Sequence, residues 1–441
     1  MRDYLTILGA GLAGSEAAWQ AAERGVSVVL YEMRPVKPTP AHKTDHCAEL
    51  VCSNSLGNNL SPSAPYLLKE ELRKFNSLVI DAGDTHAVPA GAALAVDREL
   101  FSKKITEQLL KHPNITLIRE EVTEIPSEGP VIVATGPLTS PRLSESISRL
   151  IGQEYLYFYD AISPIVDANT IDYDKTFFAS RYDKGTDDYL NCPLNEGQYY
   201  SLVNELKNGE KVPFKSFEKP IYFEGCMPVE ELAMRGDKTL AFGPLKPVGL
   251  LHPETKEQFY AVVQLRHENN EGTAFNLVGF QTKLTYPEQK RVIRLIPGLE
   301  HAEFFRFGAI HRNTYINAPD VLSCELDLKK NSGIYFAGQI IGVEGYVESV
   351  AMGLLAAISA VKRIKGEVYS TPPVDTALGS LLKYVTETRR QSFQPMNINY
   401  GLFQVQEMKI RNKRERNKKI ELKALDSLSQ WMETINGELV K

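Results

Sequence analysis

The chain has 441 residues, of which 43% are hydrophobic and 24% charged, and its formal net charge is −5. This length exceeds the roughly 250–300 residues that one hydrophobic core usually serves, so we expect more than one domain. The composition is that of an ordinary soluble protein, and no apolar run reaches the roughly 20 residues that a membrane-spanning helix needs. The start, MRDYLTILGAGLAG, lacks the features of a signal peptide. We therefore expect a cytoplasmic protein that contacts no membrane.

The cysteines do not form a recognisable framework. Their number is odd and no C-x-x-C pair occurs, so we expect neither a disulfide network nor a metal site. They are Cys47, Cys52, Cys192, Cys226 and Cys324. Cys226 lies at a Gly/Pro break in FEGCMPVEELAMRG, and Cys52 lies in a long irregular segment. Taken alone, each is more readily explained as a small buried side chain than as a nucleophile.

The N-terminal segment carries the strongest local signal. A short apolar strand over residues 4–8 precedes Gly9-x-Gly11-x-x-Gly14, an Ala-rich helix follows, and a second strand ends at Glu32. In such a unit the first glycine permits a tight turn, the second lets a pyrophosphate approach the backbone, and the third allows close helix–strand packing. The terminal acid accepts hydrogen bonds from ribose hydroxyls. The pattern predicts dinucleotide binding, and the alternative is a glycine-rich turn in an unrelated α/β unit.

The next elements continue an α/β pattern. Residues 34–59 read as a loop, and a loop of this length in a compact domain is usually functional. Residues 63–83 predict a helix followed by a strand, and residues 91–112 predict a strand with a helix that starts near Asp97. Two further strands are expected within residues 115–125 and 129–137, the second ending at Thr135-Gly136. That ending is typical of flavoproteins, in which it turns beside the cofactor.

From about residue 155 the texture changes to aromatic and β-branched segments, which predict a mixed, mostly antiparallel sheet. These segments are residues 154–166, 219–233, 258–269 and 274–286. Residues 332–364 then return to a strand, a glycine-rich turn and a long helix, and the part after residue 385 reads as helical and polar. Two glycine-rich strand–turn–helix units, one toward each end of the chain, favour FAD as the dinucleotide.

We therefore predict an α/β fold, an FAD-binding Rossmann-type domain of the glutathione-reductase-like flavoprotein class with an inserted α+β domain. The FAD-binding domain is expected over residues 1–180 and 316–441, with the inserted domain at residues 181–315. Residues 409–419, KIRNKRERNKK, hold a local net charge of +6 in an otherwise acidic chain. Such a segment is either an RNA-binding patch or the solvated face of a terminal helix.

Several sequence blocks together resemble the folate- and FAD-dependent tRNA uracil-54 C5-methyltransferases, the TrmFO family. They run from residue 7 to about residue 350 and are GAGLAGSEAAW, AELVCSNS, PAGAALAVDRELF, VIVATGPLTS, FEGCMPVEELAMRG, FGPLKPVGL, NLVGFQTKLTYPEQKRV, HRNTYINAP and FAGQIIGVEGYVES. The resemblance implies that a one-carbon unit passes from 5,10-methylenetetrahydrofolate through reduced FAD to C5 of a uracil in the tRNA T-loop. It also implies NADPH or NADH as reductant, tRNA as partner and no obligatory protein partner.

The resemblance also assigns site residues. It implies Cys226 as the nucleophile, because a thiolate that adds to uracil C6 makes C5 nucleophilic, and it gives Cys52 a supporting role. Tyr346 is a candidate for stacking in the cofactor pocket, and His311 and Arg312 are candidates for folate or RNA contact. The remaining cofactor contacts implied are Gly9, Ala10, Gly11, Leu12, Ala13, Gly14, Glu32, Gly338 and Gln339. The RNA contacts expected are Lys409, Arg411, Lys413, Arg414, Arg416, Lys418 and Lys419.

Four alternatives stay open at this point. The related MnmG family modifies the tRNA wobble uridine and has longer chains, and a paralogue with the same chemistry acts on ribosomal RNA. A generic FAD oxidoreductase would leave Cys226 inert and would depend on neither folate nor RNA. A non-catalytic FAD-stabilised RNA-binding protein would keep its function in Cys226→Ala.

Overall fold

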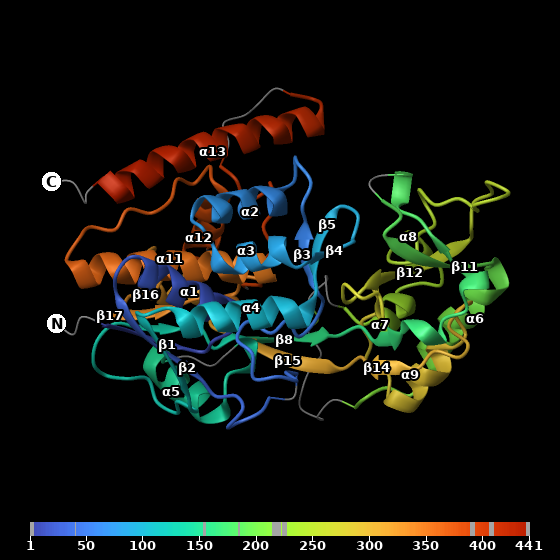
Figure 1. Cartoon of the computed structure of the whole chain (residues 1–441), viewed down its shortest axis with the longest axis horizontal. Coiled ribbons are helices and arrows are strands. Elements are labelled where there is room, and N and C mark those ends of the chain that lie inside the picture. Colours follow the sequence, from blue (N-terminus) through green and yellow to red (C-terminus); the bar gives the residue numbers. More distant parts are fainter. Residues whose placement is uncertain are drawn as a thin grey trace.

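The structure, a computed structural model, divides into a larger and a smaller unit (Figure 1). It describes residues 4–39, 41–152, 156–183, 186–213, 222, 227–388, 393–404 and 410–437. No helix in this described part is long and apolar enough to cross a membrane.

A six-stranded sheet with the order β16-β17-β7-β1-β2-β6 forms the centre of the larger unit. Its strands are β1 (Tyr4–Leu8), β2 (Ser27–Glu32), β6 (Ile115–Arg119), β7 (Val131–Val133), β16 (Asp327–Leu328) and β17 (Asn331–Phe336). Strand β1 lies parallel to β2 and β7, and β17 lies parallel to β7. The carboxyl ends of these four strands therefore meet at one edge of the sheet, where ligands bind in open α/β sheets.

Helices from both ends of the chain cover this sheet. They are α1 (Leu12–Glu23), α2 (Ala64–Lys74), α3 (Leu78–Thr85), α4 (Arg98–Lys111), α5 (Pro141–Ile151), α10 (Ala318–Val321), α11 (Tyr346–Lys365), α12 (Ala377–Glu387) and α13 (Lys413–Gly437). Helix α1 packs so closely on α11 that a Cβ on Gly353 would lie 2.2 Å from the carbonyl oxygen of Ala13. Both halves of the chain share one hydrophobic core, so the larger unit is a single domain split in sequence.

The smaller unit has its own sheet and its own core. The strand order is β10-β11-β12-β13-β9-β14, and all the pairings are antiparallel. The elements are β9 (Ile165–Asp167), β10 (Phe177–Phe178), β11 (Tyr189–Leu194), α6 (Glu196–Asn208), α7 (Val229–Met234), α8 (Thr239–Phe242), β12 (Ala261–His267), β13 (Ala274–Leu277), α9 (Tyr286–Ile293) and β14 (Phe304–Arg306). The expected fold class, an α/β domain with an inserted α+β domain, is confirmed.

The chain enters and leaves the inserted domain through two neighbouring strands. Strand β8 (Leu156–Ala161) pairs antiparallel with β15 (Ile310–Tyr315). A small third sheet of β3 (Ser55–Asn58), β5 (Ala93–Val96) and β4 (Ala87–Val88) belongs to the larger unit. The division at residues 181 and 315 stays a prediction, although β9 already belongs to the second sheet and favours an earlier first boundary.

Two expected strands are helices. Residues 78–83 were expected to form a strand, but they lie in α3, where the Ser77 hydroxyl accepts a hydrogen bond from the Ile80 amide and caps the helix. This helix is buried on several sides, so its apolar run shows no helical period. The strand expected at residues 219–233 is wrong for its described end, which forms α7.

Candidate cofactor cleft and cysteine loop

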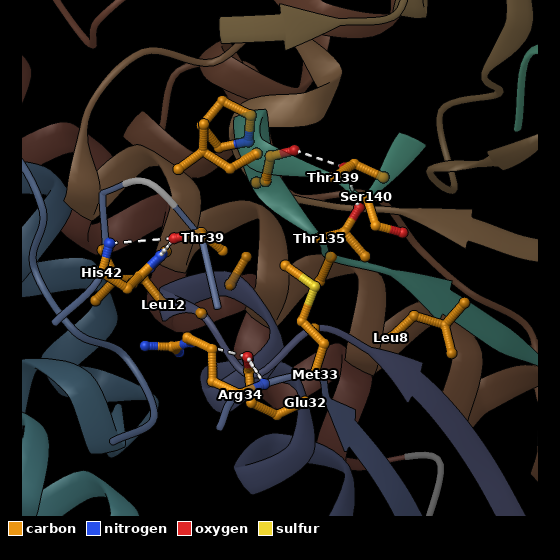
Figure 2. Close-up of a pocket in the computed structure, with 18 of the residues that line it drawn as sticks. Leu8, Leu12, Glu32, Met33, Arg34, Thr39, His42, Thr135, Thr139 and Ser140 are labelled. Atoms are coloured by element: carbon orange, nitrogen blue, oxygen red, sulfur yellow. Dashed lines mark hydrogen bonds and ion pairs between the residues drawn. The ribbon is translucent and has the colours of Figure 1, made fainter. Parts of the chain in front are cut away.

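A cleft opens at the carboxyl edge of the first sheet (Figure 2). The wall of the cleft includes Leu8 at the end of β1, Glu32 at the end of β2 and Ala134 directly after β7. The turn after β17 contributes Gly338 and Gln339. The cleft is therefore built by segments from both ends of the chain, as the two glycine-rich units predict.

The three motif glycines have different surroundings. Gly9 has φ +95°, and a Cβ there would meet the backbone of Ala134 at 2.8 Å. A Cβ on Gly14 would lie 1.8 Å from the Gly9 carbonyl oxygen, so this glycine permits close packing of helix on strand. Gly11 lines the cleft, and no heavy atom lies within 4 Å of the place where its Cβ would be. Space in front of Gly11 is thus open to a ligand, as a pyrophosphate site requires.

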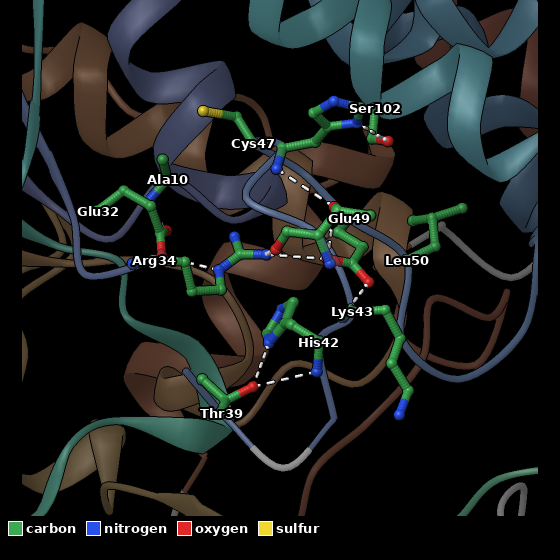
Figure 3. A network of polar contacts seen from close by, with 12 residues as sticks. Ala10, Glu32, Arg34, Thr39, His42, Lys43, Cys47, Glu49, Leu50 and Ser102 are labelled. Carbon is green, nitrogen blue, oxygen red and sulfur yellow. Dashed lines mark hydrogen bonds and ion pairs between the residues drawn. The ribbon is translucent and has the colours of Figure 1, made fainter. Parts of the chain in front are cut away.

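Glu32 ends β2 and belongs to a network of charged side chains at the cleft wall (Figure 3). One carboxylate oxygen accepts from the Ala10 amide at 3.1 Å, and the other accepts from the Arg34 backbone amide and from Arg34 Nε at 2.8 Å. Arg34 also pairs with Glu49 at 3.0 Å. Burial opposes the charge of Glu32, but the hydrogen bonds from Arg34 outweigh it and hold the pKa of Glu32 below its usual value.

The loop after β2 and the turn after β7 form opposite walls of the cleft. The Thr39 hydroxyl lies 2.6 Å from His42 Nδ1, and both residues line the cleft. Burial, followed by the positive charge of Arg34, lowers the pKa of His42 to about 4, so this imidazole is neutral near pH 7. Across the cleft, Thr135 and Thr139 are joined through their hydroxyls at 2.6 Å. These walls offer hydroxyl and neutral imidazole groups to a bound molecule.

The Cys52 loop lies beside the same cleft. Val51 and Tyr346 line the cleft, and the Tyr346 hydroxyl accepts hydrogen bonds from the Cys52 amide at 2.8 Å and the Ser53 amide at 3.2 Å. The sulfur of Cys52 lies 3.8 Å from the carbonyl oxygen of Ala161, at the end of β8. Burial raises the pKa of Tyr346, so its hydroxyl keeps its proton. The tyrosine therefore joins the cleft wall to the backbone of the cysteine loop.

A buried acidic side chain, that of Glu344, holds Gln339. The amide nitrogen of Gln339 donates to Glu344 at 2.9 Å. Burial, followed by the charge of Asp160, raises the pKa of Glu344 well above its usual value. Glu344 fixes the side chain of Gln339, which lines the cleft.

The structure brings most of the predicted cofactor residues together. Those that line the cleft are Gly9, Gly11, Leu12, Ala13, Glu32, Gly338, Gln339 and Tyr346. Ala10 donates to Glu32 and Gly14 packs under the turn, so these two support the cleft from behind. Cys226 and Lys409 lie outside the described residues, as do the side chains of His311 and Arg312.

The rest of the basic segment begins α13. The side chains of Arg411, Lys413, Arg414, Arg416, Lys418 and Lys419 are all exposed. Lys418 pairs with Glu421 at 2.6 Å and donates to the Ser61 hydroxyl at 3.0 Å. The opposite face of α13 buries Ile420, Leu428 and Trp431 in the first core. The basic segment is thus both a helix face in solvent and a concentrated positive surface.

The cleft residues that the sequence analysis did not identify come from irregular segments. Arg34, Thr39, His42 and Glu49 all lie in the long loop after β2, which was expected to be functional without any residue being singled out. Arg34 follows Glu32 by two positions, and this spacing is the one local signal available for it. Thr135 and Gly136, which were expected beside the cofactor, do line the cleft.

Comparisons with known proteins agree with this geometry. The model of the family described as Glucose inhibited division protein A matches residues 4–368. A relative from Natranaerobius thermophilus is 57% identical over 97% of this chain and 99% of its own length, and one from Bacillus subtilis is 54% identical over 98% and 99%. Both are described as methylenetetrahydrofolate–tRNA-(uracil-5-)-methyltransferase TrmFO. The solved structure of Aquifex aeolicus GidA shares the fold, with a TM-score of 0.71 and 18% identity, over 98% of this chain and 73% of that one.

Fold and cleft together define a dinucleotide-binding protein of the flavoprotein class. The family match and the identities above narrow this class. The chain belongs to the Glucose inhibited division protein A family and, within it, to the TrmFO methylenetetrahydrofolate–tRNA-(uracil-5-)-methyltransferases.

Proposed function

We propose that this protein methylates C5 of a uracil in the tRNA T-loop, at position 54, with 5,10-methylenetetrahydrofolate as one-carbon donor, bound FAD, and NADPH or NADH as reductant. One observation carries the proposal most directly. The cleft with the dinucleotide signature shares its wall residue Tyr346 with the loop that holds Cys52. This shared residue supports the proposal that a redox cofactor binds beside the Cys52 thiol.

The residues of the cleft fit FAD. The open space before Gly11 suits a pyrophosphate, and the N-terminus of α1 follows directly, where backbone amides favour anionic groups. Among the described residues Glu32 Oε2 accepts only from Ala10, so it retains a lone pair for a ribose hydroxyl. Tyr346 lines the cleft and contacts the backbone of Cys52. Bound there, FAD would relay the one-carbon unit and the reducing equivalents.

The cysteines supply what uracil lacks. C5 of uracil is a poor nucleophile until a thiolate adds to C6, and we assign this addition to Cys226 and a supporting role to Cys52. Two described residues bracket Cys226: Tyr222 pairs with Tyr159 of β8, and Met227 is buried. Strand β8 continues to Ala161, whose carbonyl oxygen lies near the Cys52 sulfur. Strand β8 therefore pairs with Tyr222, which precedes Cys226 in the sequence, and ends at the carbonyl oxygen that lies near the Cys52 sulfur.

The N-terminus of α13 suits an RNA partner. Its first turn carries Lys413, Arg414 and Arg416, although the positive end of a helix disfavours cations. Among the described residues Arg411 and Arg414 have no acidic side chain within ion-pair distance. A polyanion would neutralise this cluster, and the phosphate backbone of a tRNA is one. The target uracil must then leave its stack to reach the cleft.

The nucleophile is tested with a small RNA that carries 5-fluorouracil at the target position. FAD-loaded wild-type protein should form an adduct that survives denaturation, and Cys226→Ala should not. Cys192→Ala is the matched control, because Cys192 is buried in the core of the inserted domain. An adduct that persists in Cys226→Ala would move the nucleophile to another residue, and Cys52→Ala would then be tested.

The RNA surface is tested by charge reversal in α13. Replacing Arg411 and Arg414 by glutamate should weaken tRNA binding and lower the slope of log K against log salt by about two. FAD absorbance should not change, since neither residue lines the cleft. The control reverses Lys290 and Arg291 on α9 of the inserted domain. An unchanged salt slope in the α13 variant would make its basic face an ordinary solvated surface.

A further inference from the structure

The Cys52 loop, residues 50–54, contains no helix or strand. Its backbone amides and carbonyl oxygens form hydrogen bonds with side chains from other parts of the chain. The carbonyl oxygens of Leu50 and Cys52 both accept from Arg98, the latter at 3.1 Å. The carbonyl oxygen of Val51 accepts from Arg306 Nη2 at 2.7 Å. Together with the two amides held by Tyr346, the peptide groups on both sides of Cys52 are fixed by long side chains. Buried peptide groups need such partners, so these side chains determine where the loop lies.

The anchors come from two domains. Arg98 begins α4 of the larger domain, whereas Arg306 ends β14 of the inserted domain. A second inserted-domain residue, Arg266 on β12, donates to the Ser53 hydroxyl and to the Asn54 side chain, each at 3.0 Å. The position of the loop is therefore set jointly by the cofactor-binding domain and by the domain whose sequence includes Cys226.

Among the described residues, the arginine side chains that contact the Cys52 loop outnumber the carboxylates that form ion pairs with them. Arg98 pairs with Glu268. For Arg306 and Arg266, no carboxylate lies within ion-pair distance among the described residues. Burial lowers the pKa of Arg306, and the neighbouring charge of Arg98 lowers it further. Leaving a buried guanidinium group without its acceptor costs free energy, so the hydrogen bond to the Val51 carbonyl oxygen is a strong anchor for the loop.

We propose that Arg306 is a positioning residue for Cys52. Through its hydrogen bond to the Val51 carbonyl oxygen, Arg306 links the position of the thiol to the position of the inserted domain. Arg98 holds the loop from the cofactor side, and Arg306 holds the intervening carbonyl from the opposite domain. When Arg306 loses this bond, Arg98 still holds the loop from the larger domain and Arg266 still holds the side chains of Ser53 and Asn54. The Val51 carbonyl oxygen, next to Cys52 in the chain, then loses its link to the inserted domain. The inference deepens the proposed function, because it assumes that Cys52 acts at the cleft.

The test compares Arg306→Met, which keeps the length of the side chain without its donors, with Arg306→Lys, which keeps one donor. FAD-loaded protein is alkylated with iodoacetamide, and each cysteine is followed by peptide mass spectrometry. Cys324 is exposed and outside the loop, so it serves as internal reference. In Arg306→Met the ratio of Cys52 to Cys324 modification should rise at least about threefold, and kcat for methylation should fall about tenfold with KM for tRNA unchanged. Arg306→Lys should stay within about twofold of wild type.

A matched control lies in the same domain. Arg294 also donates to a backbone carbonyl, that of Ala302, at 3.0 Å, and it does not touch the loop. Arg294→Met should leave Cys52 labelling unchanged. The proposal is overturned if Arg306→Met leaves the labelling ratio at the wild-type value, if Arg294→Met raises it equally, or if Arg306→Met changes only KM for tRNA. Labelling needs no RNA, so a wild-type protein that fails to methylate tRNA would defeat the proposed function without deciding this inference.

Discussion

Two glycines of the N-terminal motif should respond in opposite ways to the same substitution. Gly11 has φ −71° and ψ −168°, which alanine adopts freely, and its Cβ would point into open space. Gly11 is the residue before α1, where alanine costs about 1 kcal/mol at most relative to glycine. A Cβ on Gly14 would lie 1.8 Å from the Gly9 carbonyl oxygen, although real Cβ atoms essentially never approach within 3.0 Å. Either the turn or the helix must then move by more than 1 Å.

The two variants therefore separate cofactor binding from folding. Gly14→Ala should lower the free energy of unfolding of the cofactor-free chain by about 3 kcal/mol, at the upper end of the usual cost of overpacking. Gly11→Ala should cost about 1 kcal/mol or less, yet its methyl group occupies the space in which the backbone meets a pyrophosphate. We expect its Kd for FAD to rise at least about tenfold, which equals about 1.4 kcal/mol.

Urea unfolding of the apoprotein and fluorescence titration with FAD measure the two effects. FAD affinity in Gly11→Ala equal to that of wild type would refute the placement of the cofactor against this turn. A Gly14→Ala protein as stable as wild type would refute the packing argument. If both variants lost FAD affinity and stability to the same extent, these two substitutions could not distinguish cofactor binding from core packing.

Three further substitutions test the cleft wall and the packing of helices α2, α12 and α13 in the larger domain. Tyr346→Phe leaves the amides of Cys52 and Ser53 without their acceptor, so the free energy of unfolding measured in urea should fall by about 1–3 kcal/mol. Burial raises the pKa of Glu71 from 4.5 to about 8, so between these pH values the native chain holds a proton that the unfolded chain releases. The free energy of unfolding should therefore fall as pH rises through this range. Urea titrations at several pH values should show a flatter pH profile for Glu71→Gln. Trp431 is 4% exposed on the packed face of α13, and Trp431→Ala should cost about 3–5 kcal/mol in the same assay while it weakens tRNA binding in a filter assay.

The first sheet and its cleft were predictable because their signals are local. Strand, glycine turn, helix and terminal acid occur in one stretch, and each glycine meets the requirement that its spacing suggests. Residues 78–83 were not predictable in the same way. A short apolar run fits a buried strand as well as a buried helix, and only the Ser77 cap distinguishes them.

The cysteine loop could not be predicted from local pattern, because its partners are distant in sequence. Arg266 reaches Asn54 across 212 positions, and Arg306 reaches Val51 across 255. Neither arginine interrupts the apolar pattern of its strand in a way that indicates a partner. The family resemblance pointed to Cys52, but it said nothing of the side chains that hold this residue in place.

The connection between the inserted domain and the larger domain explains why such anchors are needed. The domain enters and leaves through paired strands β8 and β15, and a two-stranded connection by itself permits a hinge motion. The proposed chemistry needs the cofactor and Cys52 from one domain and Cys226 from the other at one uracil, and small displacements of reacting groups lower rates steeply. Arginines that bridge from the inserted domain to the Cys52 loop remove that freedom at the point where it matters. Reactivity of Cys52 should therefore report on the domain interface as well as on the cleft.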